Sequence, residues 1–200
     1  MADWREELAA FIRHEARPVE KYGHQPRLYA LTQEIGEGMA YDDDVVYAAV
    51  WLHDLGVFEG HRPEDPVELA RWDNTAYAVD RTPAILTGLG FPPAKIPAVL
   101  ECIQNHQPSG TPGTLEATIL RDADILEQLG AVGILRTVCK VGRDTRFQTF
   151  TQAVASLQKA HDHLPSMLKL EAARELAVDR TLTLRAFLSS AAFEAQQHLD

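Results

Sequence analysis

The feature that most constrains this chain is an apolar run that ends in two polar residues. Residues 48–52 are Ala-Ala-Val-Trp-Leu, and His53 and Asp54 follow directly. Residues 42–44 are all Asp and supply an N-cap and acidic first-turn residues, so we predict a helix over about 44–55. A carboxylate in the last turn of a buried helix must be paired, hydrogen-bonded or bound to a metal.

The His-Asp pair alone is weak evidence for a functional site. Neighbouring helical residues point about 100° apart, which suits a metal lying against the helix end. Gly56 is expected to end the helix in a left-handed C-cap. An imidazole and a carboxylate are compatible with Zn, Mn, Fe, Co or Ni. The rest of the chain must therefore supply further ligands.

Apolar residues recur at helical spacing along the whole chain, without sustained strand alternation or internal repeats. The pattern predicts an all-α fold of about eight to ten helices. Within the helical segment at about 67–89, a break or kink is expected near Asp73-Asn74 and again at Pro83. The other expected helices cover about 3–16, 24–35, 94–106, 114–129, a segment from Gly130, 146–162 and 166–197.

Charge and composition limit the classes of function. The net charge of -10 disfavours binding to nucleic-acid polymers or anionic membranes, and no apolar run approaches the roughly 20 residues of a membrane span. Cys102 and Cys139 lie in apolar segments without metal-ligand spacing. The first residues are charged and acidic and do not resemble a signal peptide. Together, these features favour a cytoplasmic protein.

Two further places in the chain, a histidine and a pair of aspartates, could supply partners for His53 and Asp54. His24 opens a predicted helix, where a capping or core histidine is, for this residue taken alone, a better explanation than a ligand. Asp122 and Asp124 are separated by one residue on an apolar helix, so they cannot both point the same way.

The segment after the His-Asp pair is rich in Gly, Pro and charge, and we predict a loop at about 57–66. It leaves directly from the helix end. Glu59, His61 and Arg62 could face a substrate there. Each is equally well explained as a solvated loop residue.

The order and spacing of these residues resemble the HD-domain superfamily of metal-dependent phosphohydrolases. The matching elements are His24-x-x-Arg27-Leu28, Ala49-x-x-Leu52-His53-Asp54-Leu55-Gly56 and Ala123-Asp124-Ile125-Leu126. The region from Asp122 to Gly133 and the C-terminal helices are most similar to a bacterial group of small cytosolic HD hydrolases. Some members of that group are nucleotide pyrophosphatases.

The resemblance implies that His24, His53, Asp54 and Asp124 bind one divalent metal ion. The metal would be Mn, Fe, Co, Ni, Zn or Mg. Asp124 is preferred because the family ligand lies in the Ala-Asp-x-Leu element, and Asp122 is the fallback.

The resemblance also implies an activity and a domain organisation. The expected activity is hydrolysis of a small phosphorylated compound, with a nucleotide favoured, by attack of metal-activated water. The chain is expected to be a single HD-type domain over 1–200, with a metal-binding core at about 20–130 and C-terminal helices at about 130–198. Exposed helices could support a homodimer, although no heptad seam requires one.

Two positions depart from patterns within the superfamily. Several subfamilies place Lys or Glu three residues after the Asp of the His-Asp pair, where this chain has Val57. Members with two metals need another His about twenty residues further on, where this chain has Asn74. The neutral Val57 leaves no charged side chain at that position to assist the reaction. Asn74 in place of a histidine argues for one metal ion.

Because Val57 is neutral, a general acid or base for the reaction must come from another residue. Asp54 could accept a proton itself. The other catalytic candidates are His106, Glu59 and His61. His106 matches a histidine that is frequent in the family and could face the substrate, but a histidine that ends a helix is also a common cap. The candidate cations for a phosphate are Arg27, Arg62, Arg121 and Lys169.

Two other functions compete with the phosphohydrolase. The neutral Val57 and the acidic chain allow an HD-scaffold lyase or hydratase of a small non-phosphorylated molecule. A non-catalytic helical signalling module is also conceivable, but the intact set of possible ligands counts against it, because an acidic cluster without its cation is costly.

Overall fold

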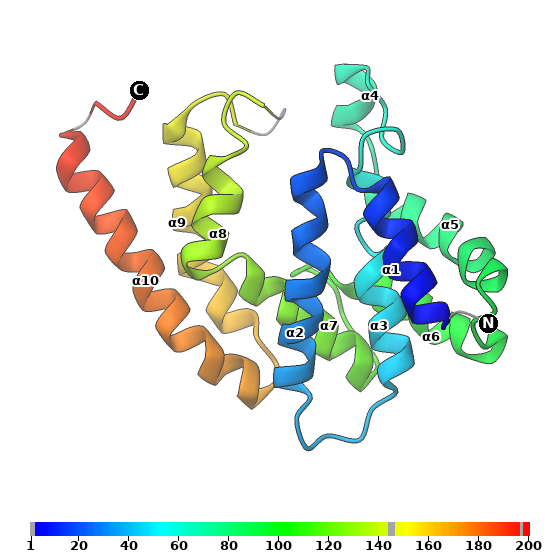
Figure 1. Cartoon of the computed structure of the whole chain (residues 1–200). Helices are drawn as coiled ribbons and strands as arrows, with labels where there is room; N and C mark the ends of the chain where they lie inside the picture. The colour runs from blue at the N-terminus through cyan, green and yellow to red at the C-terminus, as the bar shows by residue number, and fades with distance from the viewer. Residues whose placement is uncertain (1–2, 144–146, 197) are drawn as a thin grey trace. The chain divides into compact units, whose positions relative to one another are not determined.

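The computed structural model describes residues 3–143, 147–196 and 198–200. These residues form ten α-helices and no β-strand (Figure 1), which confirms the expected all-α fold. The chain divides into two compact units, the first ending at Arg121 and the second beginning at Asp122. Within the described residues, no helix has both the length and the apolar character needed to cross a membrane.

Helix α3 lies at the centre of the first unit. It packs against α1, α2 and α6, and residues 45–52 are all buried. A helix that is apolar on all sides belongs in a core. The helices of this unit are α1 (Trp4–Glu15), α2 (His24–Ile35), α3 (Asp43–Leu52), α4 (Pro66–Ala70), α5 (Asn74–Gly88) and α6 (Ile96–Asn105), and α7 (Leu115–Glu127) begins in it.

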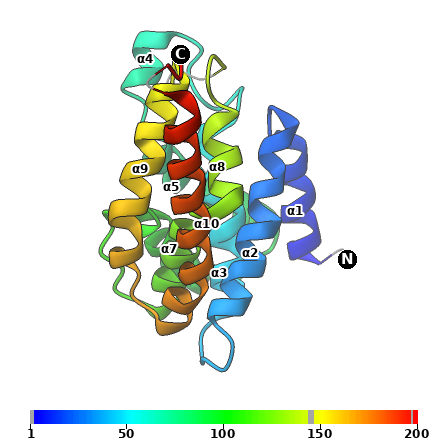
Figure 2. The ribbon, with the colours of Figure 1, turned by 90° about the vertical axis from the view of Figure 1, so that its left-hand side faces the viewer.

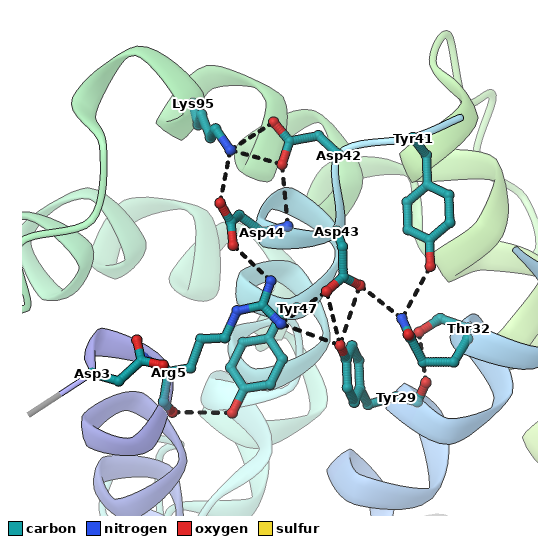
Figure 3. Close-up of polar contacts among 11 residues, drawn as sticks. Asp3, Arg5, Tyr29, Thr32, Tyr41, Asp42, Asp43, Asp44, Tyr47 and Lys95 are labelled. Atoms are coloured by element: carbon teal, nitrogen blue, oxygen red, sulfur yellow. Dashed lines mark hydrogen bonds and ion pairs between the residues drawn. The ribbon is translucent and has the colours of Figure 1, made fainter. Parts of the chain in front are cut away.

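A polar network holds the N-terminal end of α3 (Figure 3). The Asp42 side chain caps the helix by accepting a hydrogen bond from the amide of Asp44 at 3.1 Å. Arg5 of α1 pairs with Asp43 at 2.8 Å and with Asp44 at 2.6 Å. Lys95 pairs with Asp42 at 2.9 Å and with Asp44 at 2.8 Å. The network therefore fixes α3 at the end opposite the His-Asp pair.

The C-terminal end of α3 differs from the expectation. The helix ends at Leu52, and a 3-10 turn, η2 (Leu55–Val57), follows. Gly56 does not have a positive φ, so the predicted left-handed C-cap is wrong. A Cβ added to Gly56 would lie 2.6 Å from the carbonyl oxygen of Asn74 and 2.8 Å from its Cα. Glycine is required there because the start of α5 approaches the backbone closely.

The predicted break near residues 73–74 is confirmed, whereas the helix is not broken at Pro83. Helix α5 starts at Asn74, and the Asp73 side chain caps it by accepting from the amide of Ala76. The helix continues through Pro83. Its buried face includes Ala78, Thr82 and Leu86, and such packing outweighs the one hydrogen bond that a proline removes.

The second unit contains three mutually packed helices, and Figure 2 shows α9 and α10 running side by side. They are α8 (Gly130–Val138), α9 (Phe150–Met167) and α10 (Glu171–Ala195). The interruption expected between 162 and 166 lies instead at 168–170, since α9 continues through Pro165. Residues 146 and 197, which the predicted helices included, lie outside the described residues.

Candidate metal centre

His53 is anchored so that one ring nitrogen faces away from the backbone. The residue caps α3, and its amide donates to the carbonyl of Ala49 at 2.9 Å. Its Nδ1 lies 2.9 Å from the carbonyl oxygen of Val50. Since a carbonyl only accepts, Nδ1 carries the proton and Nε2 carries the lone pair. Anchoring of one imidazole nitrogen in this way is typical of histidines that bind metals through the other.

His24 and Asp54 present further ligand atoms to Nε2 of His53. His24 is the first residue of α2 and is buried. Its Nε2 lies 3.3 Å from Nε2 of His53. Oδ2 of Asp54 lies 3.6 Å from each of these nitrogens. Two nitrogens and one oxygen, brought together by the ends of two helices, thus form a nearly equilateral triangle.

The size of this triangle fits a shared divalent cation. At metal–ligand distances of about 2.1 Å, neighbouring ligand atoms lie about 3.0 Å apart in an octahedral site and about 3.4 Å apart in a tetrahedral one. The observed separations of 3.3 to 3.6 Å lie around the tetrahedral value and are somewhat longer than the octahedral one. The lone pair of His53 faces His24, so the two rings must share a proton or a cation. The chemistry of the donor set therefore fits a metal ion.

His106 repeats the arrangement of His53. It caps α6, is buried, and places Nδ1 2.6 Å from the carbonyl oxygen of Ile103. Its lone pair is therefore on Nε2. The rings of His106 and His53 are 4.9 Å apart between centroids. Possible ligand atoms of His53, Asp54 and His106 all lie within 4.8 Å of one another, so His106 belongs to the same cluster.

Asp54 is the member of the cluster that reaches solvent. Its side chain is 21% exposed, whereas that of His53 is 1% exposed. Val57, the neutral residue three positions later, accepts a hydrogen bond on its carbonyl from Nζ of Lys21 at 2.7 Å. This ammonium group near the helix end was missed by the sequence analysis. The available signal was the position of Lys21, three residues before His24.

The loop candidates make contacts of their own. Both ring nitrogens of His61 are engaged, Nε2 with Glu15 at 2.8 Å and Nδ1 with the hydroxyl of Tyr77 at 2.9 Å. Glu59 is exposed and lies 3.6 Å from Arg62. Through these contacts, His61 connects the loop to α1 and α5. The contacts therefore indicate a structural role for His61. Catalytic roles for Glu59 and His61 stay predictions.

The candidate cations occupy different environments. Arg27 is exposed on α2, one turn after His24. Arg121 is 3% exposed and donates to the carbonyl of Pro108 at 2.6 Å. The guanidinium of Arg121 is thus anchored to the backbone, whereas Arg27 is presented to solvent.

Asp122 and Asp124 lie in the second unit, on the C-terminal turns of α7. Asp122 is fully buried, and its Oδ2 accepts hydrogen bonds from the amides of Lys169 and Leu170, both at 2.8 Å. This carboxylate tethers the chain just before α10. Asp124 is partly exposed, and its Oδ2 lies 3.3 Å from the side-chain amide of Gln128.

Comparison with known structures identifies the fold. YpgQ of Bacillus subtilis in complex with ADP superimposes with a TM-score of 0.72 at 21% identity, over 96% of this chain and 94% of that one. An HD-superfamily hydrolase from Bacillus thuringiensis gives 0.68 at 18%, over 98% and 97%. A protein from Lactobacillus plantarum gives 0.72 at 18%, over 100% and 99%. No family model matches the sequence, and no curated protein does.

These likenesses extend over nearly the whole chain and include proteins described as HD-superfamily hydrolases. The chain therefore has the fold of the HD superfamily. The structural part of the resemblance drawn from the motifs is confirmed. The histidines and the aspartate of the His-Asp motif are the residues that cluster in the first unit.

Proposed function

We propose that this protein is a metal-dependent phosphohydrolase that acts on a small phosphorylated compound. The observation that carries the proposal is the triangle of His24 Nε2, His53 Nε2 and Asp54 Oδ2, with sides of 3.3 to 3.6 Å. Its size and donor atoms suit one divalent ion. The HD fold, found in proteins described as hydrolases, supports the assignment.

Asp124 is the proposed fourth ligand. The motif Ala123-Asp124-Ile125-Leu126 supports this choice. The alternative, Asp122, already accepts two backbone amides with one of its carboxylate oxygens, and that structural task makes it the poorer ligand. Two imidazoles and two carboxylates would hold the ion and could still leave it accessible to water and substrate. Such an ion polarises a phosphoryl oxygen and lowers the pKa of a coordinated water.

Two residues of the cluster can take up the proton of an attacking water. Asp54 combines a carboxylate with access to solvent. His106 carries its ring proton on Nδ1, so its Nε2 can accept another. His24 and His53 are buried, and their facing nitrogens would bind the shared ion. Their proposed role is therefore that of metal ligands and not of proton acceptors.

A nucleotide is the proposed substrate class. YpgQ of Bacillus subtilis, which shares the fold, has been crystallised with ADP, and the motifs resemble a group that includes nucleotide pyrophosphatases. Because the net charge is -10, a polyphosphate needs local cations. Lys21 lies beside the carbonyl of Val57 and Arg27 is one turn after His24. These two are the proposed phosphate-binding side chains.

The test is hydrolysis of a panel of nucleoside mono-, di- and triphosphates and simple phosphate esters by the metal-loaded protein. We expect metal-dependent release of phosphate or pyrophosphate, and a loss of at least about 100-fold in kcat on Asp54→Asn, since the substitution removes a ligand and a proton acceptor. Glu64→Gln is the matched control, because Glu64 is exposed in the following loop.

Two results would contradict the proposal. The first is a metal-loaded protein that hydrolyses no member of the panel. The second is an Asp54→Asn variant that keeps full activity. Turnover of a non-phosphorylated panel alone would support a lyase or hydratase on this scaffold.

A further inference from the structure

The outer face of α10 carries large apolar side chains that the second unit leaves exposed. Val178 is 58% exposed and Leu182 is 48% exposed. The buried side chains of the same helix, Ala173, Ala177, Leu184 and Leu188, lie on a different face, centred about 130° around the helix axis from Val178 and Leu182. The helix therefore packs through one face and presents a second apolar strip to solvent.

This strip has the spacing of a two-helix seam. Glu175, Val178, Leu182, Arg185 and Ser189 follow one another at intervals of three, four, three and four residues, and all five are exposed. Such alternation places side chains along one stripe of a helix, as at the core positions of a coiled coil. Exposed apolar residues at this spacing suit a second helix better than they suit water.

The charges on the strip indicate what that helix is. Glu175 and Arg185 lie symmetrically on either side of the apolar pair, each three residues from its neighbour in the pair. When two copies of α10 pack antiparallel, Val178 of one copy meets Leu182 of the other. In the same register Glu175 meets Arg185, and two-fold symmetry forms each contact twice.

Neither charged residue of the strip pairs with another residue that the structure describes. Among the residues that the structure describes, Glu175 and Arg185 form no ion pair. The neighbouring Arg174 is engaged by Glu171 at 2.8 Å and by the carbonyl of Lys169. The unused charges thus have opposite signs and occupy the two places that an antiparallel copy would bring together.

We propose that the protein self-associates through an antiparallel pairing of α10 with α10 of a second copy. The centre of the contact is the doubled Val178–Leu182 layer, and two Glu175–Arg185 pairs flank it. This surface lies on α10, which carries none of the proposed metal ligands, and its role does not depend on the reaction.

The test is sedimentation equilibrium of the full chain and five variants. We expect a reversible monomer–dimer equilibrium for the wild type. Glu175→Arg and Arg185→Glu should each weaken the dimer about tenfold or more, because each places like charges together at two symmetric positions. The double variant Glu175→Arg/Arg185→Glu should restore the wild-type dissociation constant.

Glu194→Arg is the matched control, since it makes the same charge change on an exposed residue of α10 away from the strip. It should leave the dissociation constant unchanged. Leu182→Ser, which alters no charge, should weaken the dimer as well. A wild type that stays monomeric at all concentrations, or single reversals without effect, would overturn the proposal. So would a double variant that fails to restore pairing.

Discussion

At the scale of single residues, Gly56 shows how one position connects the His-Asp pair to the next helix. Replacing it with Ala should lower the free energy of unfolding by about 2 kcal/mol or more, because the new Cβ would lie 2.6 to 2.8 Å from backbone atoms of Asn74. Urea denaturation measures the change. Gly88→Ala is the control, since a Cβ there meets nothing within 4 Å; a loss of stability confined to Gly88→Ala would refute the explanation.

Single residues also show what sequence could not supply. The motif residues His24, His53 and Asp54 were identified because their order and spacing follow a family pattern. Lys21 was missed, since its contact with Val57 depends on how η1 (Val19–Gly23) passes the end of α3. A contact made by tertiary packing leaves no periodic signal in the sequence.

At the scale of elements, the anchoring of α3 should depend on pH. Hydrogen bonds from Lys95 and Arg5 hold the pKa of Asp44 below its usual value of 3.8. The resulting stabilisation is therefore complete above that value and is lost as the pH falls through the lowered pKa of the folded protein. Asp44→Asn should destabilise the protein by about 1 kcal/mol at pH 7, since the pairs are partly exposed.

Denaturation at several pH values checks this expectation. The difference between wild type and Asp44→Asn should shrink in acid, because protonated Asp44 no longer pairs with either cation. Glu34→Gln, on an exposed position of α2, should show no comparable difference. A difference of the same size at pH 7 and at pH 2 would contradict the electrostatic explanation.

The loop after the His-Asp pair gives a second prediction at this scale. His61→Ala should destabilise the protein by about 1 to 2 kcal/mol, because it removes contacts with Glu15 and Tyr77 from three elements at once. If His61 is also catalytic, kcat should fall at temperatures where the variant is fully folded. Thermal unfolding and steady-state rates measured on the same sample separate the two roles, and an unchanged melting temperature would contradict the structural one.

The elements themselves were largely predictable. Periodicity located the helices, and Asp73 marked the start of α5 as expected. The predicted break at Pro83 and the predicted helix end near residue 162 are absent, because packing of the surrounding faces keeps α5 continuous through Pro83 and α9 through Pro165. Gly56 was given the wrong role for a related reason, since its requirement comes from Asn74, a residue distant in sequence.

At the scale of the whole molecule, metal binding and folding should be coupled. A divalent ion that binds only the folded protein stabilises it by about 2.7 kcal/mol when its concentration is 100 times the dissociation constant. Chelation should therefore lower the melting temperature of the wild type, and readdition should restore it. The effect should be absent in Asp54→Asn, and an equal response in that variant would place the metal elsewhere.

The central claim is that His24, His53, Asp54 and Asp124 hold one divalent ion. The most direct measurement is elemental analysis of the purified and reconstituted protein, comparing wild type with Asp54→Asn, Asp124→Asn and Asp122→Asn. We expect about one equivalent of metal in the wild type and in Asp122→Asn, and a marked loss in the other two variants. Retention of metal in Asp54→Asn and Asp124→Asn, or no uptake by the wild type after reconstitution, would contradict the account.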